Sequence, residues 1–344
     1  MHDPIPLTVI TGFLGSGKTT LLRNFLRQRG GSGIGVVVNE LGEVGLDQDL
    51  LVHAAEHVEL VAQGCMCCAR RGDIAKALHD LIRRARRQGG SWIEEAIIET
   101  SGMADPAPII ATVLQDPWLR NNVTLRGVIT VFDAVEGRRN LTAHPEVVRQ
   151  IAIGDVVVVT KSDLRGADDR KTLEATIATY VPDAQVFDSH EPGFSLASII
   201  PTMTGSNASR PTKQIESAGH AHETTSFVLP LDGDVDWPAF TVWLSALLHC
   251  HGDRILRVKG KLYAASTGKP LIIHGVQHLM YPPVHLEAEP DDDRHSWLVF
   301  ITSGLARHEI TESLDRFLRH APTAVVDLPG ASVERHTQAA GPAA

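Results

Sequence analysis

The sequence predicts an α/β protein in which a mostly parallel sheet, sandwiched by helices, is followed by a smaller α+β domain. Apolar runs of strand length alternate with amphipathic segments from residue 7 to about residue 205. Such alternation is typical of a parallel sheet with helices on both faces. The run Val156–Val159 is entirely apolar, as expected for a strand buried on both sides. Beyond residue 224, several strand-like runs follow one another closely, which favours a small antiparallel sheet covered by two helices.

The first domain is predicted to span residues 1–205. Its strands are expected at 7–11, 34–39, 95–99, 124–132, 155–160 and 184–188. Its helices are expected at 18–29, 73–87, 107–114, 144–152, 168–180 and 193–200.

A composition break separates the two domains. Residues 206–223 are rich in small polar residues and lack periodicity, so we interpret them as a linker. Residues 224–330 form the second domain, with strands near 225–231, 254–258, 261–266, 270–274 and 297–302. Its helices are expected to start after Asp236, a suitable N-cap, and near Ala306. Residues 331–344 have the composition of a disordered tail.

Composition limits the classes of function. The net charge of −9 argues against nucleic acid or an anionic membrane as the main partner. No apolar run approaches the roughly 18 residues needed to cross a bilayer, and the acidic N-terminus does not resemble a signal peptide. We therefore expect a cytoplasmic protein. Of four cysteines, only Cys250 lies outside one short cluster, and we expect it to be a small buried apolar residue.

The most informative motif directly follows the first predicted strand. Residues 12–19 read GFLGSGKT, a complete G-x-x-x-x-G-K-T phosphate-binding loop, and a helical stretch comes next. In such P-loops the backbone N–H groups and the helix N-terminus bind phosphates, the lysine reaches the β- and γ-phosphates, and the hydroxyl holds Mg²⁺. The sequence thus predicts a P-loop domain that binds a nucleoside triphosphate. The predicted nucleotide ligands here are Gly12, Gly15, Ser16, Gly17, Lys18, Thr19 and Thr20.

A second predicted strand ends in a carboxylate. The segment Ile97–Gly102 places Glu99 at the end of the strand and Gly102 three residues later. The carboxyl ends of parallel strands meet at one edge of the sheet, so Glu99 is expected beside the phosphate loop. We predict that Glu99 and Thr19 position Mg²⁺ and that the Gly102 N–H contacts the γ-phosphate.

A third motif predicts the base. Thr160-Lys161-Ser162-Asp163 follows a strand of four valines and matches the T/N-K-x-D pattern with which GTPases bind guanine. Asp163 would accept hydrogen bonds from the ring N–H and the amino group, and Lys161 would lie along the base. A buried Asp163 would be left unpaired with ATP, which can give discrimination of roughly 10⁴. Thr160 stands where asparagine is more usual, so one amide contact is missing.

The cysteine cluster predicts a metal site. Cys65, Cys67 and Cys68 form a C-x-C-C motif, and thiolates at this spacing suit Zn²⁺. A further ligand must come from elsewhere, and Glu40, Glu43 and a histidine are the candidates; we favour Glu43. Buried structural cysteines and a redox switch are the alternatives. The cluster lies between the phosphate loop and Glu99, the interval that changes conformation when the γ-phosphate leaves a GTPase.

Together these motifs resemble the CobW-type GTPases, a zinc metallochaperone family of P-loop proteins. The resemblance rests on the P-loop, Asn39–Glu43, Gly64–Cys68, Glu99–Gly102 and Thr160–Asp163, and it extends to Leu256–Gly260 in the second domain. It implies a GTP hydrolase that binds zinc, or sometimes cobalt, at the C-x-C-C motif and delivers it to a client protein. Many relatives carry a His-rich linker, whereas this chain has only His220 and His222 there.

The function predicted from the sequence is that of a GTP-hydrolysing zinc chaperone with GTP, Mg²⁺ and Zn²⁺ as its ligands. Lys18, Thr19 and Glu99 are the predicted catalytic residues, and no residue stands out as a base for the attacking water. The alternatives are a zinc sensor or buffer that uses GTP as a structural ligand, and a P-loop phosphotransferase. The predicted partner is a client metalloprotein, with neither nucleic acid nor membrane, and a homodimer is left open.

Overall fold

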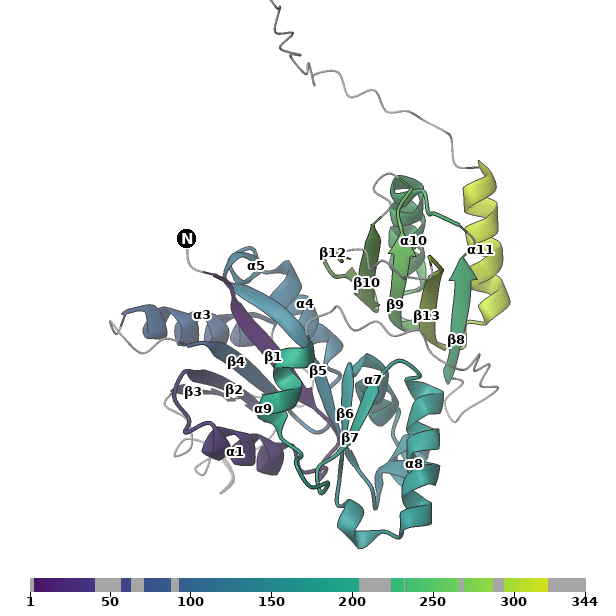
Figure 1. The fold of residues 1–344 in the computed structure, drawn as a ribbon. Helices are drawn as coiled ribbons and strands as arrows, with labels where there is room; N and C mark the ends of the chain where they lie inside the picture. Colours follow the sequence, from purple (N-terminus) through teal and green to yellow (C-terminus); the bar gives the residue numbers. More distant parts are fainter. Residues whose placement is uncertain are drawn as a thin grey trace, which may run out of the picture.

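The computed structural model describes residues 3–40, 57–62, 71–87, 93–203, 224–231, 233–265, 269–286 and 294–320. Figure 1 shows two sheets, one in each domain. Within the described residues, the first sheet has seven strands in the order β3-β2-β4-β1-β5-β6-β7, and every neighbouring pair is parallel. The strands are β1 (Ile5–Thr11), β2 (Ile34–Glu40), β3 (His57–Ala62), β4 (Glu95–Thr100), β5 (Val123–Asp133), β6 (Val156–Thr160) and β7 (Gln185–Asp188).

Helices cover both faces of this sheet, which confirms the predicted α/β sandwich. One face packs against α1 (Lys18–Gln28) and α9 (Leu196–Ile199) through an apolar cluster that includes Leu22, Phe25 and Ile97 (Figure 1). Alternate strand residues such as Ile98 and Val157 point to the other face. The helices there are α3 (Arg71–Arg87), α4 (Ala107–Gln115), α7 (Pro145–Ile153) and α8 (Ala167–Tyr180). Shorter pieces are α5 (Leu119–Asn122), α6 (Gly137–Ala143), η1 (Ser162–Leu164) and η2 (Ile200–Met203).

The C-terminal domain is built on an antiparallel sheet of order β11-β10-β9-β13-β8, with β12 paired to β10. Its helices cover one face, where aromatic side chains such as Phe240, Trp243 and Phe300 fill the core. Asp236 caps the first of these helices by accepting a hydrogen bond from Ala239 N (3.1 Å), as its sequence predicts. The elements are β8 (Thr224–Leu231), α10 (Trp237–His251), β9 (Ile255–Tyr263), β10 (Pro270–Val276), β11 (Leu279–Met280), β12 (Val284–His285), β13 (Ser296–Ser303) and α11 (Arg307–His320).

The opposite face of the second sheet packs on the first domain. Leu256 of β9 and Ile301 of β13 belong to the same apolar cluster as residues of α7 and α8. Beside this cluster, Arg257 forms ion pairs with Asp155 (2.6 Å) and Asp183 (3.5 Å), and Lys259 lies 3.5 Å from Asp183. Asp155 and Asp183 precede β6 and β7, so this contact lies at the amino edge of the parallel sheet.

The charges in this contact stabilise one another. Burial alone would raise the pKa of Asp155 and of Asp183, but the positive charges of Arg257 and Lys259 outweigh it and hold both pKa values below the usual range. Burial likewise opposes the charge of Arg257, and the two carboxylates more than offset it, so the pKa of Arg257 is raised. Asp155, Asp183 and Arg257 are therefore charged in the folded protein at neutral pH.

The structure differs from the sequence-based expectation at several places, and α5, α6, β11 and β12 are among the elements that were not predicted. Strand β3 was not predicted, although its first four residues, His57–Leu60, alternate between polar and apolar. The predicted strands at 254–258 and 261–266 are one strand, β9, because Gly260 continues the ladder opposite Leu298 and Ile273. Cys250 is exposed, which contradicts the expectation of a buried residue, because it lies on the outer side of α10. The predicted linker at 206–223 and the tail at 331–344 lie outside the described residues.

In the part of the chain that the structure describes, no helix combines the length and the apolar character required to cross a membrane.

Candidate functional site

The loop between β1 and α1 has the backbone of a phosphate cradle. Gly12, Gly15 and Gly17 all have positive φ angles, of 144°, 71° and 93°, which other residues rarely adopt. A Cβ on Gly12 would overlap the Val131 carbonyl oxygen and lie 2.9 Å from Ser16 Oγ. The loop therefore needs glycine at this position for close packing as well as for its turn.

Polar groups in the loop fit a phosphate ligand. Ser16 is 2% exposed, and its Oγ has no hydrogen-bond partner among the described residues. A buried polar atom without a partner is costly, and a bound ligand can supply the partner. Lys18 opens α1 and donates a hydrogen bond to the Phe13 carbonyl oxygen (3.1 Å), which holds its ammonium group over the loop.

The predicted magnesium ligands are brought together. Thr19 Oγ1 donates a hydrogen bond to Glu99 Oε1 at 2.5 Å, and Glu99 is fully buried at the end of β4. A hydroxyl and a carboxylate are the oxygen ligands that Mg²⁺ prefers, so this pair fits the ion. Gly102 lies directly against the phosphate loop, since a Cβ on it would be 2.7 Å from Leu14 N.

The predicted base-binding motif, Thr160–Asp163, is attached to the phosphate loop by two hydrogen bonds. Thr160 Oγ1 donates to the Ser16 carbonyl oxygen (2.7 Å), and Lys161 Nζ donates to the Gly15 carbonyl oxygen (2.8 Å). Lys161 has a left-handed backbone (φ 57°) and forms an ion pair with Asp133 at 2.5 Å. Thr160 stands where asparagine is more usual, and its hydroxyl group still connects the motif to the phosphate loop.

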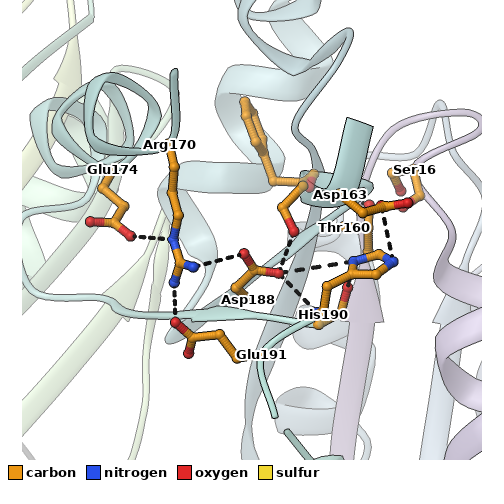
Figure 2. A network of polar contacts seen from close by, with 11 residues as sticks. Ser16, Thr160, Asp163, Arg170, Glu174, Asp188, His190 and Glu191 are labelled. Atoms are coloured by element: carbon orange, nitrogen blue, oxygen red, sulfur yellow. Dashed lines mark hydrogen bonds and ion pairs between the residues drawn. The ribbon is translucent and has the colours of Figure 1, made fainter. Parts of the chain in front are cut away.

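Asp163 lies at the edge of the site and is not buried. Its side chain is 53% exposed and contacts His190 Nε2 at 3.1 Å. Figure 2 shows this pair beside Asp188, whose Oδ1 accepts hydrogen bonds from Ser162 Oγ (2.6 Å) and His190 N (2.9 Å). The expectation of a buried Asp163 is therefore wrong for this structure, in which the carboxylate faces both solvent and the His190 ring.

Arg170 of α8 contacts acidic residues around Asp188. It forms ion pairs with Asp188 (3.4 Å) and Glu174 (3.2 Å) and contacts Glu191 (Figure 2). The contact with Glu191 is the first cause of the raised Arg170 pKa. These bonds link α8 to the segment that follows β7 and so hold the segment that carries His190.

A cavity of about 390 Å³ adjoins the phosphate loop and the base-binding motif. Such a volume is in the range of small-molecule sites. Its lining joins polar groups to apolar ones, which suits a heterocyclic base and its ribose. The lining residues are Gly17, Thr20, Leu21, Asn24, Phe25, Gln28, Thr160, Lys161, Ser189, His190, Phe194, Ser195 and Leu196.

The residues of this site that were not predicted from the sequence include Asp133, Ser189, His190 and Phe194. Asp133 and Ser189 follow the apolar parts of two predicted strands, and polar residues at strand ends were the signal that identified Glu99. The same rule could have found them. His190 and Phe194 carry no such signal, because their position depends on the turn after β7.

The predicted zinc ligands cannot be placed. Cys65, Cys67, Cys68 and Glu43 lie outside the described residues, and Glu40 ends β2. Across the described ranges, no cluster of three or more His, Cys, Asp or Glu side chains could hold a metal ion. The chain leaves β3 at Ala62, at the carboxyl edge of the sheet, three residues before Cys65.

A second cavity, of about 400 Å³, lies between the domains at the opposite edge of the sheet. Lys259, Asp183 and His274 line its polar part, and His274 Nε2 is buried with no hydrogen-bond partner among the described residues. Burial, and then the nearby positive charge of Lys259, lower the pKa of His274 to about 4. His274 is therefore neutral at physiological pH.

Comparisons with known proteins agree with this geometry. Residues 6–188 match the family model described as CobW/HypB/UreG, nucleotide-binding domain, and residues 224–318 match the cobalamin synthesis protein cobW C-terminal domain. The chain is 32% identical to the zinc chaperone YjiA of Escherichia coli (strain K12), over 90% of this chain and 97% of that protein. It is 31% identical to the zinc chaperone CobW of Pseudomonas aeruginosa, over 90% of each chain.

A solved structure agrees as well. The Zn(II)-bound YjiA GTPase from E. coli superposes with a TM-score of 0.71 at 27% identity, covering 92% of this chain and 99% of that one. The two family models together match both domains, including the phosphate loop and the base-binding motif. The chain therefore belongs to the CobW/HypB/UreG family of nucleotide-binding proteins.

Proposed function

We propose that this protein is a GTP-hydrolysing zinc chaperone that binds Zn²⁺ at its C-x-C-C motif and transfers it to a client metalloprotein. The observation that carries the nucleotide part is the direct bonding of Thr160 and Lys161 to the phosphate loop, beside a cavity large enough for a nucleoside. Two relatives that are about one-third identical over nearly the whole chain are named as zinc chaperones, which supports the zinc part.

Each residue at the phosphate end has a role in hydrolysis. Lys18 and the loop N–H groups stabilise the negative charge that develops during phosphoryl transfer, and they are held in position before the substrate arrives. Thr19 and Glu99 hold Mg²⁺, which neutralises phosphate charge when it is bound. Gly102 presents its N–H to the γ-phosphate, which makes the segment after Glu99 sensitive to hydrolysis.

Guanine specificity rests on Asp163. Its carboxylate accepts the two N–H donors of guanine, for which adenine has no equivalent pair. His190 Nε2 lies 3.1 Å from this carboxylate, so the base would bind beside the His190 ring. Lys161 lies beside the same cavity and supports the base through its aliphatic stem.

The zinc site is proposed to respond to the nucleotide. The cysteine segment starts from the carboxyl end of β3, and Glu99 and the phosphate loop lie at the same edge of the sheet. Cys65, Cys67 and Cys68 with Glu43 would then hold zinc in one nucleotide state and release it in the other. A coupling of about 1–3 kcal/mol would change zinc affinity roughly 5–150-fold.

The nucleotide part is tested with Asp163→Asn. We expect the variant to bind GDP about 10–100-fold more weakly, because it loses charge-assisted hydrogen bonds worth about 1.5–3 kcal/mol, and to gain affinity for xanthosine diphosphate. Asp169→Asn, an exposed carboxylate on α8, is the control. Equal GDP affinity in wild type and Asp163→Asn would overturn the proposed specificity.

The zinc part is tested by competition with a chromophoric chelator, with GDP or a non-hydrolysable GTP analogue bound. We expect Cys67→Ala to lower zinc affinity and Cys250→Ala, at the exposed cysteine of α10, to leave it unchanged. We also expect the affinity of the wild type to differ between the two nucleotides. Zinc binding that is identical in both states would favour a zinc buffer over a chaperone.

A further inference from the structure

The segment that follows Glu99 is held in place by two glutamines from outside it. This segment, Ser101–Pro106, will be called the sensor loop. Gln150 of α7 is 1% exposed, and its Nε2 donates hydrogen bonds to the carbonyl oxygens of Gly102 and Ala104, each at 3.0 Å. Gln277, in the turn between β10 and β11 of the C-terminal domain, donates from Nε2 to Asp105 Oδ2 (3.1 Å).

These bonds act on the most adaptable part of the sensor loop. Glycine has the greatest backbone freedom of any residue, and the bond to its carbonyl limits the conformations open to Gly102. Gly102 also touches Leu14 of the phosphate loop. A shift of the sensor loop would therefore change the contact between Gly102 and the phosphate loop.

Gln277 makes its contact with Asp105 from a backbone conformation that is unfavourable for glutamine. Its φ of 51° is unfavourable for a residue with a side chain, and glycine would fit the turn with less strain. Its side chain instead reaches Asp105 across the domain boundary. Asp105 Oδ1 meanwhile accepts a hydrogen bond from Ala107 N (2.9 Å) and so fixes the start of α4.

Arg257 makes further interdomain bonds to the helix that carries Gln150. Arg257 of β9 donates hydrogen bonds to the carbonyl oxygens of Ala152 and Gly154 at the C-terminal end of α7, the helix that carries Gln150. The C-terminal domain thus contacts the sensor loop directly through Gln277 and supports Gln150 through Arg257.

We propose that Gln150 and Gln277 are positioning residues for GTP hydrolysis, and that the C-terminal domain, through Gln277, sets the position of the sensor loop. The proposal rests on the proposed GTPase function. It gives the C-terminal domain a defined part in the chemistry of the other domain: a client or ligand that moves the β10–β11 turn would change the hydrolysis rate without touching the nucleotide.

The test uses the full-length chain and Gln277→Gly, which removes the side chain and relieves the positive φ, so that the fold is not penalised. We expect kcat for GTP hydrolysis to fall about five-fold, the rate equivalent of one hydrogen bond, while the Kd for GDP stays within two-fold. Gln150→Leu should act in the same direction. Gln115→Ala, at an exposed glutamine at the end of α4, is the control and should change neither.

An introduced negative charge provides the rescue experiment. Gln277→Glu places a carboxylate against Asp105 and should lower kcat further than Gln277→Gly. The addition of Asp105→Asn should restore kcat, because the new amide can donate to Glu at 277 while its oxygen still caps α4. A Gln277→Gly enzyme with unchanged kcat, or with GDP affinity reduced as much as kcat, would overturn the proposal.

Hydrogen exchange separates this proposal from the proposed function. In the nucleotide-free protein, the amides of Met103–Asp105 should exchange faster in Gln277→Gly than in wild type or Gln115→Ala. If the wild type hydrolyses no GTP, the proposed function fails, and the exchange rates still decide whether Gln277 holds the sensor loop. Equal exchange in the three proteins would refute the positioning role by itself.

Discussion

Replacement of Arg257 by methionine is the most direct test of how the two domains are joined. Arg257 is 3% exposed, pairs with Asp155 and Asp183, and also donates to two backbone carbonyl groups. The cluster of Arg257, Lys259, Asp155 and Asp183 contains two positive and two negative charges. Methionine preserves much of the apolar volume of the side chain but leaves one buried carboxylate without a matching cation.

The expected cost follows from that imbalance. Removal of one partner from a buried ion pair costs about 3–5 kcal/mol, because the remaining charge stays desolvated. With a urea m-value of about 3 kcal/mol/M, this loss lowers the unfolding midpoint by about 1–1.7 M. The measurement is urea unfolding of the full chain at pH 7, followed by circular dichroism and by tryptophan fluorescence.

Two further variants make the result interpretable. Arg294→Met removes a pair of similar geometry, since Arg294 Nη2 lies 3.0 and 2.9 Å from the oxygens of Asp234, but that pair is exposed. It should cost at most about 1 kcal/mol. Arg257→Met with Asp183→Leu restores the charge balance and should be more stable than Arg257→Met alone. If Arg257→Met costs no more than Arg294→Met, the buried cluster does not join the domains as we infer.

Three other predictions concern pH and the nucleotide site. The pKa of His274 is about 4 in the folded protein and about 6.5 when unfolded, so the unfolded chain binds the proton first and stability falls as pH drops from 6.5 towards 4. At pH 5.5 the resulting loss in the free energy of unfolding is about 1.4 kcal/mol. Urea unfolding at pH 8 and pH 5.5 should show that His274→Gln lacks this loss. A variant whose stability depends on pH as the wild type's does would contradict the prediction. Gly102→Ala places a Cβ 2.7 Å from Leu14 N, so GTP turnover should fall at least about ten-fold. GDP binding, measured by fluorescence, should persist. Normal turnover would show that Gly102 does not stay in contact with Leu14. Thr19→Ala should remove the effect of Mg²⁺ on GDP dissociation, measured with and without a chelator, whereas Thr19→Ser should retain it; a Thr19→Ala protein that still responds to Mg²⁺ would exclude Thr19 as a ligand.

Local patterns in the sequence were sufficient for the α/β architecture of the first domain, apart from strand β3, and for the placement of Thr19 beside Glu99. Two kinds of pattern carry this information: the hydrophobic periods of strands and helices, and the spacing of glycine, lysine and threonine at residues 12–19. Both are short-range, because each depends only on residues that are close in the sequence. Parallel strands share a direction, so their carboxyl ends lie at the same edge of the sheet. The residues at the ends of the strand before Glu99 and of the valine strand before Thr160 are therefore expected at that edge. That rule predicts that Thr19 and Glu99 lie together, as they do in the structure.

Only the tertiary structure decided which groups meet across long stretches of chain. The edge position of β3, the contact of His190 with Asp163, and the bonds of Gln150 and Gln277 to the sensor loop all join residues from different elements. No local pattern encodes such contacts, because they result from how helices and sheets pack. The sequence by itself determined that the chain has a G-x-x-x-x-G-K-T loop, a T-K-x-D motif and a C-x-C-C motif. The packing of the second domain on α7 decided that Gln277 reaches the first domain.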